Sequence, residues 1–298
     1  ELTRGVVAMH ARMGRFGEVQ QDALSDKKIF VAMASYRDSE TQHTVADLLA
    51  RADYPQRIRI VVCNQLMPGE DEDCRFSAAP QVTIDEVDAR ESQGANWARA
   101  RAMSHMKNED YVLIIDSHMR AEQGWDTRLL HMHARCQQPD TLITGYLPGY
   151  TPPNKRDYTP YHPTRIRVRD FGKDHDPQLI HLTGHFIARQ SQQHGLYPTP
   201  FVVHNFLFAP RAVWQRVPID PHIHFYGDEI SLAARLWTHG IDVVQPDGMV
   251  LYHYWARKGR EGVEHYRNRL SQASSRTRQR VYHLLGLAQA SDGKALVE

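Results

Sequence analysis

An aspartate and a histidine two residues apart follow a short apolar run, and their types suit metal chemistry. The run Val-Leu-Ile-Ile at residues 112–115 leads directly into Asp116-Ser117-His118. Such a run predicts a buried central strand, and ligands of open α/β sheets bind beyond the carboxyl ends of the strands. Because side chains at i and i+2 lie on one side of an extended chain, Asp116 and His118 can reach one Mn²⁺, Mg²⁺ or Zn²⁺ ion. The alternative is that Asp116 only caps the following helix.

Apolar runs alternate with helical patterns along the first half of the chain, which predicts a parallel, doubly wound sheet. Strands are expected over residues 29–34, 57–63, 82–87 and 141–145, and helices over residues 39–51, 94–106 and 125–136. A nucleotide would lie across the carboxyl ends of these strands. Gly94 opens the second of these helices, where a residue without a side chain lets the backbone approach a ligand closely.

The second half predicts a further set of short strands and one strongly amphipathic helix. Strands are expected over residues 181–188, 201–208, 242–245 and 249–253. Gly227-Asp228-Glu229 opens a helix over residues 230–239 that Gly240 ends. Acidic residues are favoured at a helix N-terminus by the macrodipole alone, so this pair is open to a structural as well as a functional interpretation. Residues 148–178 are rich in proline, glycine, tyrosine and charge, and we expect a long loop or extended excursion there.

Composition describes an ordinary globular protein, with 41% hydrophobic and 24% charged residues. The net charge of +1 provides no global field that would attract nucleic acid or an acidic membrane. Between Ala256 and Arg280, however, the sequence contains eight Arg or Lys residues and only two Glu residues. This segment is interpreted either as a phosphate site or as a solvated helix face. Three scattered cysteines and the lack of a run of 18 apolar residues lead us to expect a cytoplasmic protein.

Together these motifs resemble nucleotide-sugar glycosyltransferases of the GT-A fold, an α/β fold with a Rossmann-like, mostly parallel central sheet flanked by helices. Asp116-Ser117-His118 followed by Gly124-Trp125-Asp126 is similar to the metal motif of the polypeptide N-acetylgalactosaminyltransferases. The chain resembles more closely glycosyltransferase family 60, the N-acetylglucosaminyltransferases that act on hydroxyproline of a cytoplasmic protein. The segments that carry this second resemblance are Ala34–Asp38, Asn64-Gln65, Ile115–Arg120, Gly227–Ile230 and Leu236–Gly240.

The resemblance implies a division of the chain into five parts. These are an N-terminal extension (1–26), a nucleotide-sugar-binding half (27–147), an acceptor-side loop excursion (148–180), an acceptor and catalytic half (181–260), and a basic C-terminal helix and tail (261–298). The smaller acceptor-side part is where the resemblance is weakest. In the galactosaminyltransferases an acidic residue follows the metal motif, whereas this chain has Met119-Arg120.

The resemblance also implies roles for individual residues. Asp116, His118 and His253 would hold Mn²⁺ (or Mg²⁺), which bridges the diphosphate of a UDP-sugar. The expected contacts to the nucleotide-sugar are Ser35, Tyr36, Arg37, Asp38, Gln65, Gly94, Arg99, Asp116 and Ser117, with Tyr36 as the ring that stacks on the base. Asp228 or Glu229 would orient sugar hydroxyls or the acceptor, or alternatively carry a transient covalent sugar. We favour core packing over sugar binding for Trp125.

We therefore expect a metal-dependent transfer of a sugar, N-acetylglucosamine, from a UDP-sugar to an acceptor hydroxyl, with retention of anomeric configuration. The acceptor would be a protein side chain, a glycan, a small molecule or a modified nucleotide. Two alternatives are a nucleotide-sugar-binding module that has lost turnover, and a nucleic-acid binder that uses the basic segment 256–280. Intact Asp116, His118 and His253 argue against the first, and the near-zero net charge argues against the second.

Overall fold

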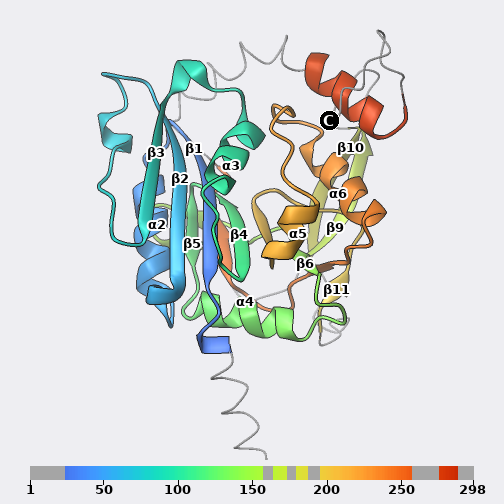
Figure 1. Cartoon of the computed structure of the whole chain (residues 1–298), viewed down its shortest axis with the longest axis horizontal. Coiled ribbons are helices and arrows are strands. Elements are labelled where there is room, and N and C mark those ends of the chain that lie inside the picture. Colours follow the sequence, from blue (N-terminus) through green and yellow to red (C-terminus); the bar gives the residue numbers. More distant parts are fainter. Residues whose placement is uncertain (1–23, 157–163, 173–178, 187–194, 257–274, 288–298) are drawn as a thin grey trace, which may run out of the picture.

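The computed structural model describes residues 24–156, 164–172, 179–186, 195–256 and 275–287. Its centre is an eight-stranded sheet with the strand order β11-β13-β6-β12-β4-β1-β2-β3 (Figure 1). This sheet is mostly parallel and has helices on both faces, which confirms the expected α/β fold class. Within the described ranges, no helix has the length and apolar character needed to cross a membrane.

Four parallel strands from the first half of the chain bring their carboxyl ends to one edge of the sheet. They are β1 (Ile29–Tyr36), β2 (Ile58–Leu66), β3 (Val82–Asp88) and β4 (Tyr111–Asp116). In their register Ala34 of β1 lies opposite Asp116 of β4, and Ser35 lies opposite Asn64 of β2. The polar residues that end these runs therefore gather along one rim, as the parallel arrangement requires.

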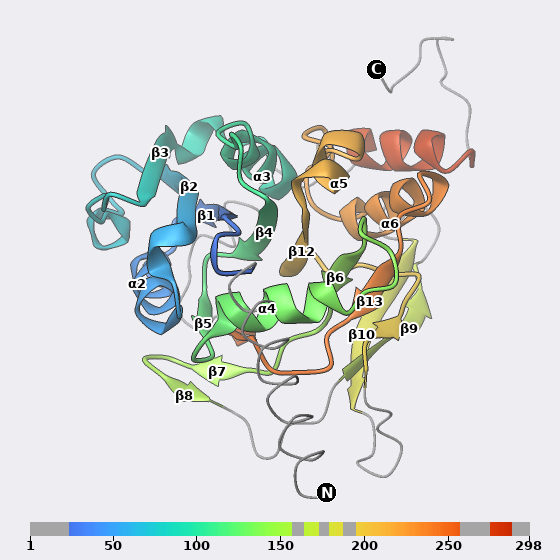
Figure 2. The same cartoon turned by 60° about the horizontal axis from the view of Figure 1, so that its bottom comes forward.

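Two layers of helices cover the sheet, and each closes one apolar cluster. On one face lie α2 (Thr41–Arg51) and α4 (Trp125–Ala134), and on the other lie α3 (Ala95–Met103), α5 (Arg211–Arg216) and α6 (Asp228–Thr238) (Figure 2). Three short 3-10 helices sit in the connections, at Pro55–Arg57, Glu72–Cys74 and Ala89–Glu91. Alternate residues of β1 point to the two clusters, which explains why its sequence is continuously apolar.

The second half of the chain completes the same sheet. Strand β12 (Phe206–Pro210) runs antiparallel between β4 and β6 (Leu142–Thr144), and β13 (Val243–Gln245) and β11 (Tyr197–Pro198) follow at the edge. We expected one strand over residues 201–208, but the strand starts at Phe206. The reason lies at Val203, whose backbone N–H and C=O both bond to the Thr144 hydroxyl instead of to a strand.

Among the described residues, three two-stranded antiparallel sheets border the central sheet, and two of them take strands from residues 148–178, where we expected a long loop or extended excursion. They are β5 (Met119–Ala121) with β14 (Leu251–His253), β7 (Tyr150–Thr151) with β8 (Lys155–Arg156), and β9 (Thr164–Phe171) with β10 (Ile180–Phe186). Buried Arg120 fixes the second of these sheets, because its guanidinium donates to the Tyr150 hydroxyl (3.1 Å) and to the Asn154 side chain (2.8 Å).

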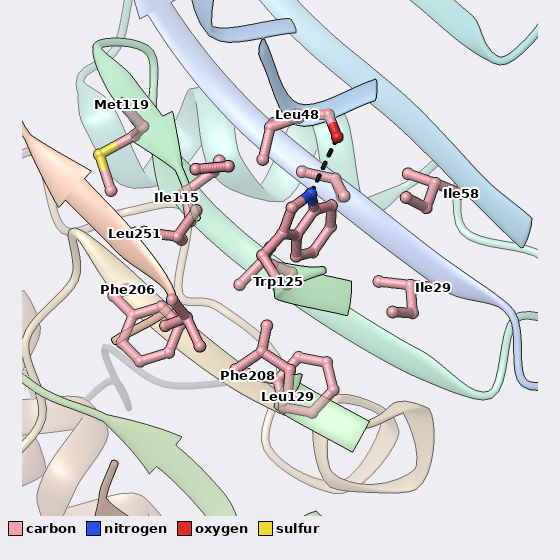
Figure 3. Packing of buried hydrophobic residues seen from close by; sticks show 14 of the residues in the cluster. Ile29, Leu48, Ile58, Ile115, Met119, Trp125, Leu129, Phe206, Phe208 and Leu251 are labelled. Carbon is pink, nitrogen blue, oxygen red and sulfur yellow. Dashed lines mark hydrogen bonds between the residues drawn. The ribbon is translucent and has the colours of Figure 1, made fainter. Parts of the chain in front are cut away.

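Trp125 packs in the core, which is the alternative that we favoured over sugar binding, and one substitution tests how much that packing contributes. The ring is fully buried, and its Nε1 donates to the Leu48 carbonyl over 2.8 Å (Figure 3). We expect Trp125→Phe to lower the free energy of unfolding by about 1–3 kcal/mol, because it leaves a buried carbonyl unsatisfied and a small cavity. Urea unfolding measures the effect. Trp237→Phe is the control: this ring is 79% exposed, and its loss should change stability by less than about 0.5 kcal/mol.

Candidate active site

Three side chains converge at the carboxyl end of β4. Asp116 is the last residue of β4, and His118 follows it by two residues. His253 is the last residue of β14, which pairs with β5 so that His253 lies opposite Met119. His253 Nε2 lies 3.1 Å from Asp116 Oδ2, and His118 Nε2 lies 3.9 Å from the same oxygen. The ligand atoms of all three lie within 4.8 Å of one another. The structure thus brings together residues 137 positions apart in the sequence.

The donor set fits a divalent cation. Two imidazole nitrogens and one carboxylate oxygen form a mixed N/O set of the kind that Mn²⁺, Mg²⁺ or Zn²⁺ accepts. Both histidines are buried. A hydrogen bond and a nearby charge also keep the Asp116 carboxylate ionised. Burial alone would raise the pKa of Asp116, but the hydrogen bond from His253 and the charge of Arg99 hold that pKa well below its usual value.

Arg99 of α3 joins this triad to the start of α6. Its guanidinium donates to Asp116 over 3.1 Å, to Asp228 over 3.3 Å and to Asn96 over 2.9 Å. His204 Nδ1 lies 3.2 Å from the same Asp228 oxygen. Burial, and then the charge of Arg99, lowers the pKa of His204 well below its usual value, so this ring is neutral. Arg99 is therefore the buried cation that balances two carboxylates on this side of the site.

Asp228 makes stability depend on pH in a defined direction. Burial raises its pKa to about 6, although Arg99 opposes the shift, whereas an unfolded aspartate titrates at about 3.9. Between these two values the folded protein holds a proton that the unfolded chain has lost, so raising the pH weakens folding. We expect the unfolding free energy of wild type relative to Asp228→Asn to fall from about pH 4 to about pH 6 and to stay level outside that window. Urea titrations of both proteins across this range provide the measurement.

The other residues expected to contact the nucleotide-sugar occupy the same rim in different settings. Ser35 and Gln65 are fully buried and bond to Thr41 and to the Ser35 carbonyl, so they hold the ends of β1 and β2 in place. Tyr36 is half-buried at the end of β1. Arg37 adopts a positive φ of 50° and pairs with Asp71 over 2.7 Å.

Gly94 and Ser117 also have defined neighbours. Gly94 precedes α3 with φ 111°, and a Cβ on it would lie 2.3 Å from the carbonyl oxygen of His224. Glycine is therefore required here because the backbone of His224 lies so close. Ser117 is buried, and its hydroxyl donates to Asp38 over 2.5 Å. Glu229, the second acid at the start of α6, accepts from the backbone N–H of His204 over 3.1 Å.

Sequence reasoning missed His204, Asn205 and Trp255. The first two residues precede β12 and therefore reach the rim that the end of β4 forms, because the strands are antiparallel. Asn205 is buried, and neither atom of its side-chain amide has a hydrogen-bond partner among the described residues. The Trp255 ring lies against the His253 ring at a centroid distance of 4.1 Å, tilted by 56°, and also contacts the Tyr146 ring. The available signal was the polar pair His204-Asn205 before the apolar run of β12. That pair does not reveal that β12 runs antiparallel to β4.

The basic segment is only partly described. Of residues 256–280, Ala256 and residues 275–280 fall inside the described ranges, and the latter lie in a helix that extends to 284. In that helix Arg280 pairs with Asp220 over 2.7 Å, and Thr277 accepts from the backbone of His224. Five of the eight basic residues of this segment, all within 257–274, lie outside the described residues, and the phosphate site stays a prediction.

Comparisons with known proteins agree with this geometry. The family model described as Glycosyltransferase (GlcNAc) matches residues 28–79 and 71–297. A crystal structure of GalNAc-T7 with UDP, GalNAc and Mn²⁺ superposes with a TM-score of 0.63 at 13% sequence identity, which shows a shared GT-A fold. The alignment covers 86% of this chain and 47% of that one, so the chain spans about half the length of GalNAc-T7. No curated protein matches the chain.

Proposed function

Because the chain belongs to the family Glycosyltransferase (GlcNAc), we propose that it moves N-acetylglucosamine from a UDP-sugar to an acceptor hydroxyl with the help of a divalent metal. One observation carries the proposal: Asp116, His118 and His253 converge at the ligand-binding edge of a GT-A sheet. The structure of GalNAc-T7 with UDP, GalNAc and Mn²⁺ supports a UDP-sugar donor and manganese here.

In this proposal Asp116, His118 and His253 hold the cation. When bound, the ion neutralises the negative charge that builds on the departing UDP diphosphate. Arg99 supplies a second positive charge 3.1 Å from Asp116, in a buried setting where little water screens it. Asp116 and Asp228 share this charge in the free protein, and we propose that Arg99 contributes to stabilising the same developing charge when Asp116 also binds the cation.

The acids at the start of α6 orient the donor sugar. Asp228 is buried against Arg99 and His204, and the backbone N–H of His204 donates to Glu229. Because both carboxylates are already engaged, we assign them to positioning rather than to a covalent sugar. Retention then follows if the acceptor attacks from the face that UDP leaves. The bond from C1 to the diphosphate oxygen breaks, the bond to the acceptor oxygen forms, and the acceptor proton passes to the departing oxygen.

The remaining contacts divide between the base and the acceptor. Tyr36 and Arg37, at the end of β1, are proposed to contact uracil and ribose, because they lie on the same rim as Asp116. The acceptor side is proposed at the β9–β10 hairpin, since Gly184 packs against Tyr146, which in turn touches Trp255 beside His253. The acceptor class stays a proposal that includes a protein side chain, a glycan and a small molecule.

A screen of UDP release tests the function directly. Purified protein is incubated with UDP-glucose, UDP-galactose and their N-acetylated forms, with Mn²⁺ or with chelator. We expect release of UDP above the no-enzyme rate with UDP-N-acetylglucosamine and Mn²⁺, and none with chelator. Release from none of the four donors, or equal release with chelator, would contradict the proposal.

A further inference from the structure

Behind the His118 ring, on the side away from Asp116, lies a buried carboxylate. Asp38 is 1% exposed, and its Oδ2 lies 2.8 Å from His118 Nδ1. The same oxygen accepts from the Ser117 hydroxyl over 2.5 Å. The other carboxylate oxygen, Oδ1, accepts from the backbone N–H of Glu40, just before α2. The two carboxylate oxygens of Asp38 therefore have different partners: Oδ2 contacts His118, and Oδ1 contacts the backbone just before α2.

The first contact determines which nitrogen of His118 carries the proton. A carboxylate offers only lone pairs, so the Nδ1 that faces Asp38 must donate. In the neutral ring the lone pair then lies on Nε2. That nitrogen is the one turned toward Asp116 and His253, within the 4.8 Å set. A cation needs this lone pair, and a carboxylate that bonds the opposite nitrogen of a ligating histidine also increases its basicity.

We propose that Asp38 is a positioning residue that fixes the Nδ1–H tautomer of His118 and aims its Nε2 at the metal site. The inference rests on the proposed function for its metal, and it gives Asp38 a task other than contact with the nucleotide. Ser117 contributes to the arrangement by donating to the same oxygen. The competing interpretation is that Asp38 only stabilises the start of α2.

Asp38→Asn separates the two interpretations, because asparagine has almost the same shape. Its amide oxygen can still accept from Glu40 N–H, while its NH₂ group now faces His118 and can only donate. Nδ1 must then accept, which moves the proton to Nε2. In ¹⁵N spectra of the histidine-labelled, metal-free protein, at a pH where the ring is neutral, we expect the His118 signal to change from the Nδ1–H to the Nε2–H pattern. Comparison with His118→Gln assigns that signal.

A second readout is the affinity for Mn²⁺, measured by electron paramagnetic resonance of the free ion. We expect Asp38→Asn to weaken Mn²⁺ binding about 10–100-fold with an unchanged unfolding midpoint. Asp85→Asn is the matched control: it makes the same exchange at a carboxylate that pairs with Arg101 away from the triad, so tautomer and affinity should both stay as in wild type. A lower unfolding midpoint in Asp38→Asn with wild-type tautomer and affinity would overturn the proposal in favour of a purely structural role.

The two readouts also separate this inference from the proposed function. If wild type binds no Mn²⁺ while the tautomer still switches in Asp38→Asn, the metal of the proposed function is wrong, and only the control of the His118 tautomer by Asp38 stands. If wild type binds Mn²⁺ and the tautomer is the same in both proteins, the function stands and the role of Asp38 is refuted.

Discussion

Replacing Asp116 with alanine is expected to reduce Mn²⁺-dependent release of UDP from UDP-N-acetylglucosamine by at least about 100-fold. The change removes the only carboxylate of the triad and leaves two imidazoles to hold the ion. It also removes one of the two carboxylates that balance buried Arg99. A coupled assay of free UDP, at saturating Mn²⁺ and at equal concentrations of folded protein, measures the loss.

Two further measurements make this result specific to the metal. Mn²⁺ should raise the thermal unfolding midpoint of wild type, because the ion binds only the folded state, and it should have no such effect on Asp116→Ala. Asp85→Ala is a matched control, because Asp85 forms an ion pair with Arg101 away from the triad. This variant should retain activity. Activity that tolerates both Asp116→Ala and chelator would show that the metal assignment is wrong.

The largest loss of stability is expected at Asp126, in the motif that follows the metal residues. Its carboxylate is fully buried and accepts from Arg57 Nη2 over 2.8 Å and from the backbone N–H groups of Asp53 and Tyr54. Asp126→Ala leaves a buried guanidinium without its counter-charge and two N–H groups without acceptors. We expect the free energy of unfolding to fall by about 3–5 kcal/mol, as measured by urea denaturation.

A surface ion pair provides the comparison. Asp140 pairs with Arg216 over 2.7 Å, but both side chains are more than a third exposed. Asp140→Ala should therefore change stability by less than about 1 kcal/mol. Equal effects of the two substitutions would mean that the Arg57–Asp126 pair does not hold the fold together. Asp126→Ala will also lose activity, and the unfolding data identify that loss as structural.

Much of the fold and the position of the first two candidate metal ligands follow from local sequence. Continuous apolar runs with helical patterns between them require a parallel sheet covered on both faces, and the polar residues after those runs must share an edge. The rule predicts that Asp116 and His118 lie together at the carboxyl end of β4, because one ends that strand and the other follows it by two residues. His253 is different: only the resemblance to known families placed it with them, because the pairing of β14 with β5 has no local signal.

The contacts that were not predicted all depend on long-range geometry. Asp38 and His118 are 80 residues apart, and nothing in either motif indicates that one supports the other. His204 and Asn205 reach the site only because β12 is antiparallel to β4. The β9 strand was missed for another reason. Residues 164–171 alternate arginine with isoleucine and valine, and this period-two pattern was obscured by the composition of the wider segment.

The central place of β12 has a consequence for how the chain matures on the ribosome. The edge of β4 that β12 covers belongs to the apolar run 112–115, and residues 117 to 210 must be synthesised before it is covered. At about 5–20 residues per second, those 94 residues take about 5–19 s. During that interval the nascent chain presents an uncovered apolar strand edge to other chains. We therefore expect translation speed and chaperone binding over this stretch to affect how much of the protein reaches its native form.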